Sequence, residues 1–328
     1  MPKWLRSICI TVTVACLFAA NSAQARPVVF PAPDQELMVN VEGGRIYVRV
    51  NGKLSGTKPP IVLIHGGPGG THGSLMDATE LADERAVILY DQLDSGRSEH
   101  PNDPANWKVG RFVNELDAIR TALGIERWYV LGHSWGGTIA LEYGARRPQE
   151  LAGLILAGPL ISTRSWLSDA SALLEKLPAS TLAELKACDS PQPPAAVICD
   201  AATAEFYKEF NRREPVAPVM KDYSNTLGDG FNQRIYEAMW GKSEFVSTGT
   251  LKAYDGEPLL TKLDGQHTLF IVGQYDEARP VTAAQFADRV AGSELAVVPG
   301  AAHAILIDRP DETIGLLRAW LDRQDAHN

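Results

Sequence analysis

WYVLGHSWGGTIALEYGAR, residues 128–146, is the stretch on which the interpretation of the whole chain depends. Its first four residues are apolar and favour a buried strand, and the residues from Thr138 onward have a helix-like pattern. Ser134 lies between them in a sharp turn, where the flanking Gly132 and Gly136 leave room for a strained backbone. The pattern G-x-S-x-G at a strand-to-helix turn predicts that Ser134 is a nucleophile.

Short apolar runs elsewhere in the chain are typical of strands that are buried on both faces of a parallel sheet. Residues 37–41 and 45–50 alternate between apolar and polar around Gly43 and Gly44, which predicts a hairpin that precedes these apolar runs. Helix-like stretches between several runs indicate a doubly wound, mostly parallel α/β fold. The predicted strands are 61–64, 86–90, 128–131, 153–156, 268–272 and 294–298, and the predicted helices are 112–123, 139–146, 283–290 and 312–321.

One segment, residues 160–256, breaks this alternation because it contains no clear buried strand. It has helical patches separated by proline clusters, which predicts a mainly helical cap inserted into a core formed by residues 26–159 and 257–328. Such a cap would cover the carboxyl ends of the strands, where open α/β sheets bind their ligands.

The first 25 residues have the organisation of a secretory signal peptide. Lys3 and Arg6 precede an apolar run, and Ala23-Gln24-Ala25 is a cleavage signal. The run is shorter than the roughly 20 residues that span a membrane. We therefore expect a periplasmic or secreted protein without stable membrane association; an uncleaved anchor, or a lipoprotein cleaved before Cys16, is the alternative.

Charge and cysteine content narrow the class of protein further. The formal net charge of −9 argues against nucleic acid as a partner. Cys188 and Cys199 flank a proline-rich loop and would form a disulfide in an oxidising compartment, with two free thiols as the alternative. The sequence has neither a C-x-x-C pair nor an H-E-x-x-H motif, so no metal site or cofactor is expected. Nothing in it decides the oligomeric state.

A serine nucleophile needs a base, and the base needs a group that orients it. In this fold the order along the chain is serine, acid, histidine. Asp276 follows the predicted strand 268–272, and His303 follows the last predicted strand, so these two residues complete the predicted triad. Asp264 and Asp288 are the alternatives for the acid, and both have the context of surface charges.

The tetrahedral intermediate needs two N–H donors for its oxyanion. The loop HGGPGG, residues 65–70, follows a predicted strand and leaves its backbone free to approach a substrate. Gly67 and Trp135, the residue after the nucleophile, are the predicted donors. The alternative is an ordinary tight turn. His65, which ends the preceding strand, is expected to shape the loop through a hydrogen bond.

With these motifs the chain resembles the proline iminopeptidase family of α/β hydrolases, over nearly all of the sequence after the leader. The matching segments are HGGPGG (65–70), DQLDSGRS (91–98), GHSWGG (132–137), EFVSTGTLKAYDG (244–256), VGQYDEARP (272–280) and GAAH (300–303). One departure is Asp94, which stands where the family usually has glycine. Aspartate tolerates a left-handed backbone better than most residues, so this turn can be retained.

The resemblance implies that Glu244 and Glu277 hold the free α-amino group of the substrate, because a desolvated ammonium requires carboxylate partners. Trp240 and Phe245 are candidates for an apolar wall around a proline-like ring. The alternative for both glutamates is an ordinary surface charge.

The expected function is therefore a serine hydrolase that releases an N-terminal residue, with proline expected, from short peptides or amides through an acyl-enzyme. One rival is an esterase or lactonase acting on small acyl substrates, because the same triad serves both. The other is a binding protein on an inactive hydrolase scaffold, which the complete set of Ser134, Asp276 and His303 disfavours.

Overall fold

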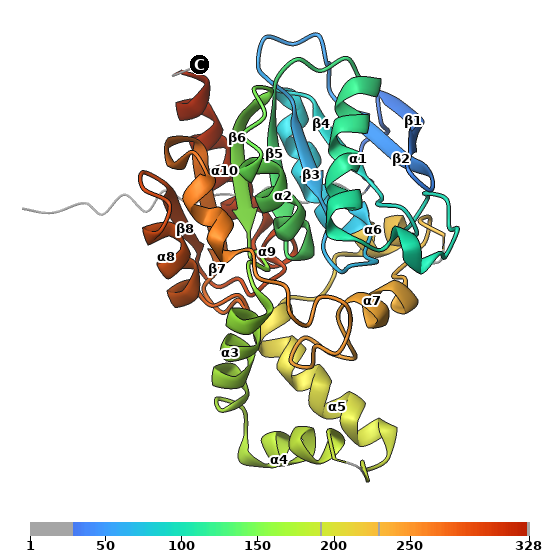
Figure 1. The fold of residues 1–328 in the computed structure, drawn as a ribbon, viewed down its shortest axis with the longest axis vertical. Coiled ribbons are helices and arrows are strands. Elements are labelled where there is room, and N and C mark those ends of the chain that lie inside the picture. The colour runs from blue at the N-terminus through green and yellow to red at the C-terminus, as the bar shows by residue number, and fades with distance from the viewer. Residues whose placement is uncertain (1–28, 191, 229, 327–328) are drawn as a thin grey trace, which may run out of the picture.

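The computed structural model describes residues 29–190, 192–228 and 230–326. Within these residues eight strands form one sheet in the order β1-β2-β4-β3-β5-β6-β7-β8 (Figure 1). β1 and β2 form the predicted antiparallel hairpin, β2 pairs antiparallel with β4, and the remaining pairs are parallel. The strands are β1 (Gln35–Val41), β2 (Gly44–Asn51), β3 (Ile61–Ile64), β4 (Val87–Tyr90), β5 (Trp128–His133), β6 (Leu151–Ala157), β7 (Thr268–Gly273) and β8 (Glu294–Val298).

The continuous apolar strands bury side chains on both faces of the sheet. In β5, Trp128 and Val130 belong to one hydrophobic core, whereas Tyr129 and Leu131 belong to the other. Because successive residues of a strand point to opposite faces, each face needs its own layer of helices. The predicted α/β class is confirmed by this sheet.

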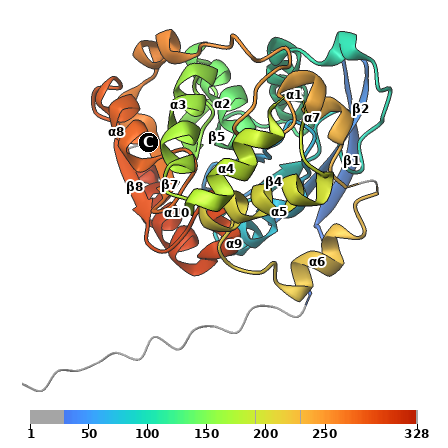
Figure 2. The same ribbon diagram turned by 90° about the horizontal axis from the view of Figure 1, so that it is seen from below.

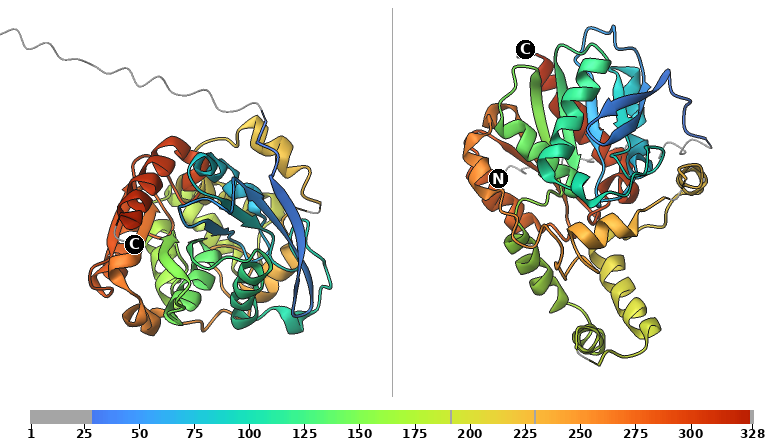
Figure 3. Two further views of the ribbon diagram at one scale, coloured as in Figure 1. Left: turned by 90° about the horizontal axis from the view of Figure 1, so that it is seen from above. Right: turned by 45° about the vertical axis from the view of Figure 1, so that its right-hand side comes forward.

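Helices cover both faces (Figure 3). One core contains residues of α1 (Val109–Ala122), α2 (Trp135–Ala145) and α8 (Pro280–Asp288). The other contains residues of the 3₁₀ segment η1 (His72–Asp83), α9 (Ile305–Asp308) and α10 (Pro310–Asp325). The four predicted helices overlap α1, α2, α8 and α10.

The chain between β6 and β7 leaves the sheet and forms a helical cap beyond the carboxyl ends of the strands (Figures 1 and 2). The two ends of this excursion are joined by an antiparallel bridge between Ser162 and Asp255. Its helices are α3 (Thr163–Leu174), α4 (Ala179–Cys188), α5 (Ala196–Phe206), the π-helical turn η3 (Tyr207–Asn211), α6 (Pro218–Ser224) and α7 (Gln233–Met239).

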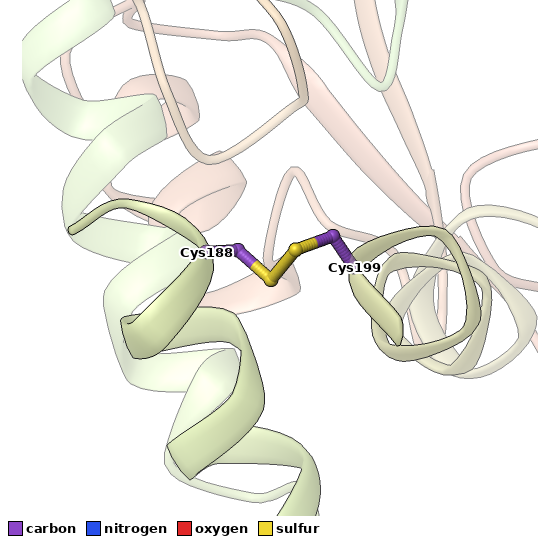
Figure 4. The surroundings of a disulfide bond; sticks show 2 residues. All are labelled: Cys188 and Cys199. Atoms are coloured by element: carbon purple, nitrogen blue, oxygen red, sulfur yellow. A yellow bond between two sulfur atoms is a disulfide. The ribbon is translucent and has the colours of Figure 1, made fainter. Parts of the chain in front are cut away.

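The cap has its own small hydrophobic core and a covalent link. The core consists of Leu173, Leu177, Leu185, Ala202, Phe206 and Phe210. Cys188 at the end of α4 and Cys199 in α5 form a disulfide across 11 residues of sequence (Figure 4). The predicted disulfide is therefore confirmed.

The expected leader, residues 1–25, lies outside the described residues. Among the helices that are described, none has both the length and the apolar character that crossing a membrane would require. The described residues also contain no cluster of His, Cys, Asp or Glu side chains that could hold a metal ion.

Candidate active site

Ser134 lies at the junction of β5 and α2, in the strained turn that the sequence predicts. Its backbone has φ of 59° and ψ of −122°, and its N–H donates to the carbonyl of Ala157 at 2.9 Å. A Cβ on Gly132 would lie 2.1 Å from the Gly136 carbonyl oxygen, and one on Gly136 would lie 2.2 Å from the Ile64 carbonyl oxygen. The turn therefore requires glycine at both positions.

Asp276 and His303 meet although 27 residues separate them along the chain. His303 Nδ1 donates to Asp276 Oδ1 at 2.7 Å, which leaves Nε2 as the nitrogen available to a nucleophile. The Asp276 carboxylate also accepts the N–H of Ala278 at 2.8 Å and that of Gly273 at 3.1 Å. These bonds fix the carboxylate, and through it the orientation of the imidazole. Ser134 and His303 line the same cavity.

The two predicted oxyanion donors come from two segments, the start of α2 and the loop after β3. Trp135 is the first residue of α2, so its N–H has no acceptor within the helix. Gly67 lines the cavity with φ of 118°, and its N–H has no acceptor among the residues described. Both N–H groups remain available for a ligand oxygen.

Gln92, which the sequence analysis did not single out, connects the two donor segments. Its amide nitrogen donates to the His65 carbonyl at 2.9 Å, and its oxygen accepts the Trp135 indole N–H at 2.9 Å. The Gln92 backbone N–H donates to His65 Nε2 at 3.1 Å. Burial lowers the pKa of His65 to about 4, so this imidazole is neutral and stabilises the loop.

Asp94, in the same loop, has a left-handed backbone with φ of 66°, as expected for a residue that replaces glycine. Its carboxylate is fully buried and accepts the Trp107 indole N–H at 2.8 Å and the Asn102 N–H at 2.7 Å. Its carbonyl accepts the Asn232 amide at 2.8 Å, which ties this loop to the cap.

The cavity beside Ser134 and His303 has a volume of about 640 Å³ and lies between the cap and the core. The apolar part of its wall comes from Val216, Met220, Phe231 and Ile307. This volume is much larger than one proline ring and has room for a short peptide.

Trp240 and Phe245 do not contribute to this wall, so their predicted role needs correction. Trp240 is buried against Trp166, with ring centroids 6.2 Å apart, and Phe245 packs on Phe206 in the cap. The physical reason is that a small cap must bury its own large apolar side chains to be stable.

Glu244 and Glu277 lie close to the triad. Glu244 lines the cavity and accepts the Tyr236 hydroxyl at 2.7 Å. Glu277 is buried behind the wall, where its Oε1 accepts the Asn211 amide at 2.6 Å. Among the described residues, Glu277 Oε2 has no hydrogen-bond partner. Burial raises the pKa of both carboxyl groups, and the Glu244 carboxylate raises that of Glu277 further.

His303 has an unusual electrostatic environment. Burial lowers its pKa, but the carboxylates of Asp276, Glu277 and Glu244 outweigh burial and raise the pKa to about 9. Its Nε2 lies 3.8 Å from Glu277 Oε1.

His133, next to the nucleophile, supports His303 from behind. Its Nε2–H donates to the His303 carbonyl at 2.9 Å, and the two ring centroids are 4.6 Å apart. Burial lowers the pKa of His133 to about 4, so the ring is neutral at physiological pH.

The π-helical turn of the cap holds the two loops that carry the predicted acid and base, and no sequence pattern indicated it. The Phe210 carbonyl accepts the N–H groups of Glu277 and His303, each at 3.1 Å. The Asn211 carbonyl accepts the N–H of Ala304 at 2.8 Å. A single turn therefore fixes the loop after β7 and the loop after β8 together.

Two further residues shape the site without a signal in the sequence. Gly158 follows β6 with φ of +48°, and a Cβ there would lie 2.8 Å from His303 Nδ1. Trp166 packs edge-on against His303 at 5.6 Å, and its indole N–H donates to the Glu244 carbonyl at 3.0 Å.

Comparison with known proteins relates the chain to the α/β hydrolase fold and to the proline iminopeptidases. The α/β hydrolase fold family matches residues 59–310. A proline iminopeptidase from Heyndrickxia coagulans is 33% identical over 289 residues, which cover 88% of this chain and 98% of that protein.

Two solved structures are similar to this chain over most of its length. The proline iminopeptidase of Mycobacterium smegmatis superposes with a TM-score of 0.80 and 32% identity, covering 89% of this chain and 99% of that one. VinJ superposes with a TM-score of 0.81 and 30% identity, covering 89% of this chain and 100% of that one.

Proposed function

The chain belongs to the proline iminopeptidases of the α/β hydrolase fold family, and from this we propose that it removes an N-terminal residue, proline above all, from short peptides or amides. The observation that carries the proposal is the carboxylate pair Glu244 and Glu277 beside the histidine of a serine nucleophile. A buried carboxylate oxygen without a partner, such as Glu277 Oε2 among the described residues, is costly unless a ligand donates to it. An ammonium group supplies that donor.

In the proposed mechanism, Ser134 Oγ attacks the carbonyl carbon of the N-terminal residue while His303 Nε2 accepts the hydroxyl proton. The oxyanion accepts hydrogen bonds from the N–H groups of Gly67 and Trp135. When the C–N bond breaks, His303 gives its proton to the leaving amine. Water then attacks the acyl-enzyme, with His303 again as base, and Ser134 is regenerated. Asp276 holds the imidazole in the tautomer that this sequence requires.

The carboxylate pair distinguishes this activity from ester or lactone hydrolysis. A neutral acyl substrate offers these two buried carboxyl groups no charged donor, which disfavours binding. An ammonium pairs with them and fixes the distance between the N-terminus and the bond that is cleaved. The same requirement restricts cleavage to the first residue.

Glu244→Gln tests the proposal, because the change removes a charge and keeps the shape of the side chain. We expect kcat/KM for prolyl-4-nitroanilide to fall by roughly 30-fold, the equivalent of about 2 kcal/mol for a charge-assisted hydrogen bond. Hydrolysis of neutral 4-nitrophenyl acetate should not decrease, because this substrate has no ammonium group to lose and the Glu244 charge raises the pKa of the predicted base His303. Glu126→Gln, at an exposed position before β5, is the matched control. Equal losses on both substrates would mean that Glu244 is structural.

We also propose that the protein works outside the cytoplasm, in the periplasm or the medium. The disulfide between Cys188 and Cys199 supports this, because such bonds persist in oxidising compartments. Mass spectrometry of the protein from its native host should find a new N-terminus after Ala25; an intact N-terminus on cytoplasmic protein would refute the proposal.

A further inference from the structure

Glu277 is placed to act on the catalytic base as well as on the substrate. Its Oε1 lies 3.8 Å from His303 Nε2, the nitrogen that must be free of a proton to activate Ser134. The other nitrogen of the ring is occupied by Asp276 at 2.7 Å. A protonated Nε2 is therefore attracted by the Glu277 carboxylate. In the neutral imidazole the lone pair of Nε2 faces the carboxylate oxygen, which is unfavourable.

The position of Glu277 is fixed, so the side chain cannot simply turn away. The Asn211 amide holds Oε1 at 2.6 Å, and the N–H of Glu277 donates to Phe210 at 3.1 Å. Only 2% of the residue is exposed, so water screens its charge poorly. Oε2 is buried as well and has no hydrogen-bond partner among the described residues.

We propose that Glu277 is a positioning residue that keeps His303 in its protonated, inactive form until the ammonium group of a substrate pairs with the Glu244–Glu277 site and releases the proton from Nε2. The inference rests on the proposed function, since it requires that the substrate carries this cation. The released proton goes to solvent, and Nε2 then accepts the hydroxyl proton of Ser134. Occupation of the amine site thereby switches on the base.

The charged and titratable groups around His303 agree with this assignment. Burial and the Glu244 carboxylate raise the pKa of Glu277, whereas a protonated His303 lowers it, so the charge on Glu277 and the proton on His303 depend on each other. The carboxylates are Asp276 and Glu277 after β7 and Glu244 after α7, and they raise the His303 pKa to about 9 against the effect of burial. His133 on β5 is neutral. Asp276 keeps its hydrogen bond when substrate binds, so the glutamates are the groups whose charge a substrate can cancel. Free enzyme at neutral pH is mostly inactive, and a bound amine lowers the His303 pKa.

The pH dependence of kcat for two substrates tests the inference, because kcat reports the substrate complex. With 4-nitrophenyl acetate, which carries no cation, turnover by the wild-type enzyme should rise through about pH 9 as His303 loses its proton. With prolyl-4-nitroanilide the rise should come about one pH unit lower or more.

Glu277→Gln gives the second arm. The ester profile should move to lower pH, so that ester turnover at pH 7 increases by about tenfold for each unit by which the His303 pKa falls. Activity toward the prolyl substrate should decrease in the same variant. A merely structural role would lower ester turnover at every pH without moving the profile. Glu126→Gln should leave the profile where it is.

Two results would overturn the inference. Coincident pH profiles for the ester and the prolyl substrate in the wild-type enzyme would show that the amine does not act on His303, while the proposed function would stand. An unmoved ester profile in a folded Glu277→Gln variant would show that the charge of Glu277 does not set the protonation of His303. Absence of prolyl cleavage would instead refute the proposed function, and the inference with it. The wild-type comparison does not depend on whether the variant folds.

Discussion

Gly158→Ala tests whether the space beside the histidine sets the rate of the reaction. A Cβ on Gly158 would lie 2.8 Å from His303 Nδ1 and 3.1 Å from Asp276 Oδ2, and the residue has φ of +48°. Gly124, in the turn before β5, has φ of +63°, and no described atom lies within 4 Å of a Cβ built there. Gly124→Ala therefore has the same backbone strain without the contact.

The magnitudes follow from these two environments. The left-handed backbone should lower the free energy of unfolding by about 1 kcal/mol in both variants, as measured by thermal or denaturant unfolding. A carbon atom does not remain 2.8 Å from a ring nitrogen, so the His303–Asp276 pair must shift. A misplacement on the order of 1 Å lowers catalysis by about 100-fold. We expect such a fall in kcat for prolyl-4-nitroanilide in Gly158→Ala alone. Equal kcat values for the two alanine variants would refute the reasoning.

Four other variants address the nucleophile, the base, the histidine behind the base and the cap. Ser134→Ala should lower kcat by roughly 10⁴-fold in a folded protein, and a loss of less than about tenfold would contradict its role. His303→Ala should be comparably damaging in the same assay, whereas His133→Ala, which removes one hydrogen bond to the His303 carbonyl, should cost about tenfold or less. Replacing Cys188 and Cys199 together by serine should lower the free energy of unfolding in a denaturant titration by about 3 kcal/mol; an unchanged midpoint would mean that the cap opens independently of the core.

The centre of the sheet, β3 to β7, could be predicted from the sequence because these strands are buried on both faces, whereas the edge strand β8 is apolar in sequence but leaves Leu295 and Val297 exposed. Such strands are continuous apolar runs, and the glycines of the turn at Ser134 mark the place where β5 ends. The order of nucleophile, acid and base along the chain then located Asp276 and His303, and the structure brings the two side chains together.

The contacts made by the cap could not be predicted in this way. Asn211 reaches Glu277 across 66 residues, from a π-helical turn that has no periodic signature. Trp240 and Phe245 are near Glu244 in sequence, but nearness in sequence does not determine which face of an irregular segment points toward a cavity. Gly158 was missed because its importance comes from the space that His303 and Asp276 need, and that is visible only in three dimensions.

The most direct test of the central claim compares prolyl-4-nitroanilide with its N-acetylated form. Acetylation removes the ammonium and leaves the bond that is cleaved unchanged. If Glu244 and Glu277 bind that ammonium, kcat/KM should fall by about 100-fold or more, as expected for the loss of two charge-assisted hydrogen bonds. Turnover of the acetylated substrate equal to or better than that of the free amine would contradict the account.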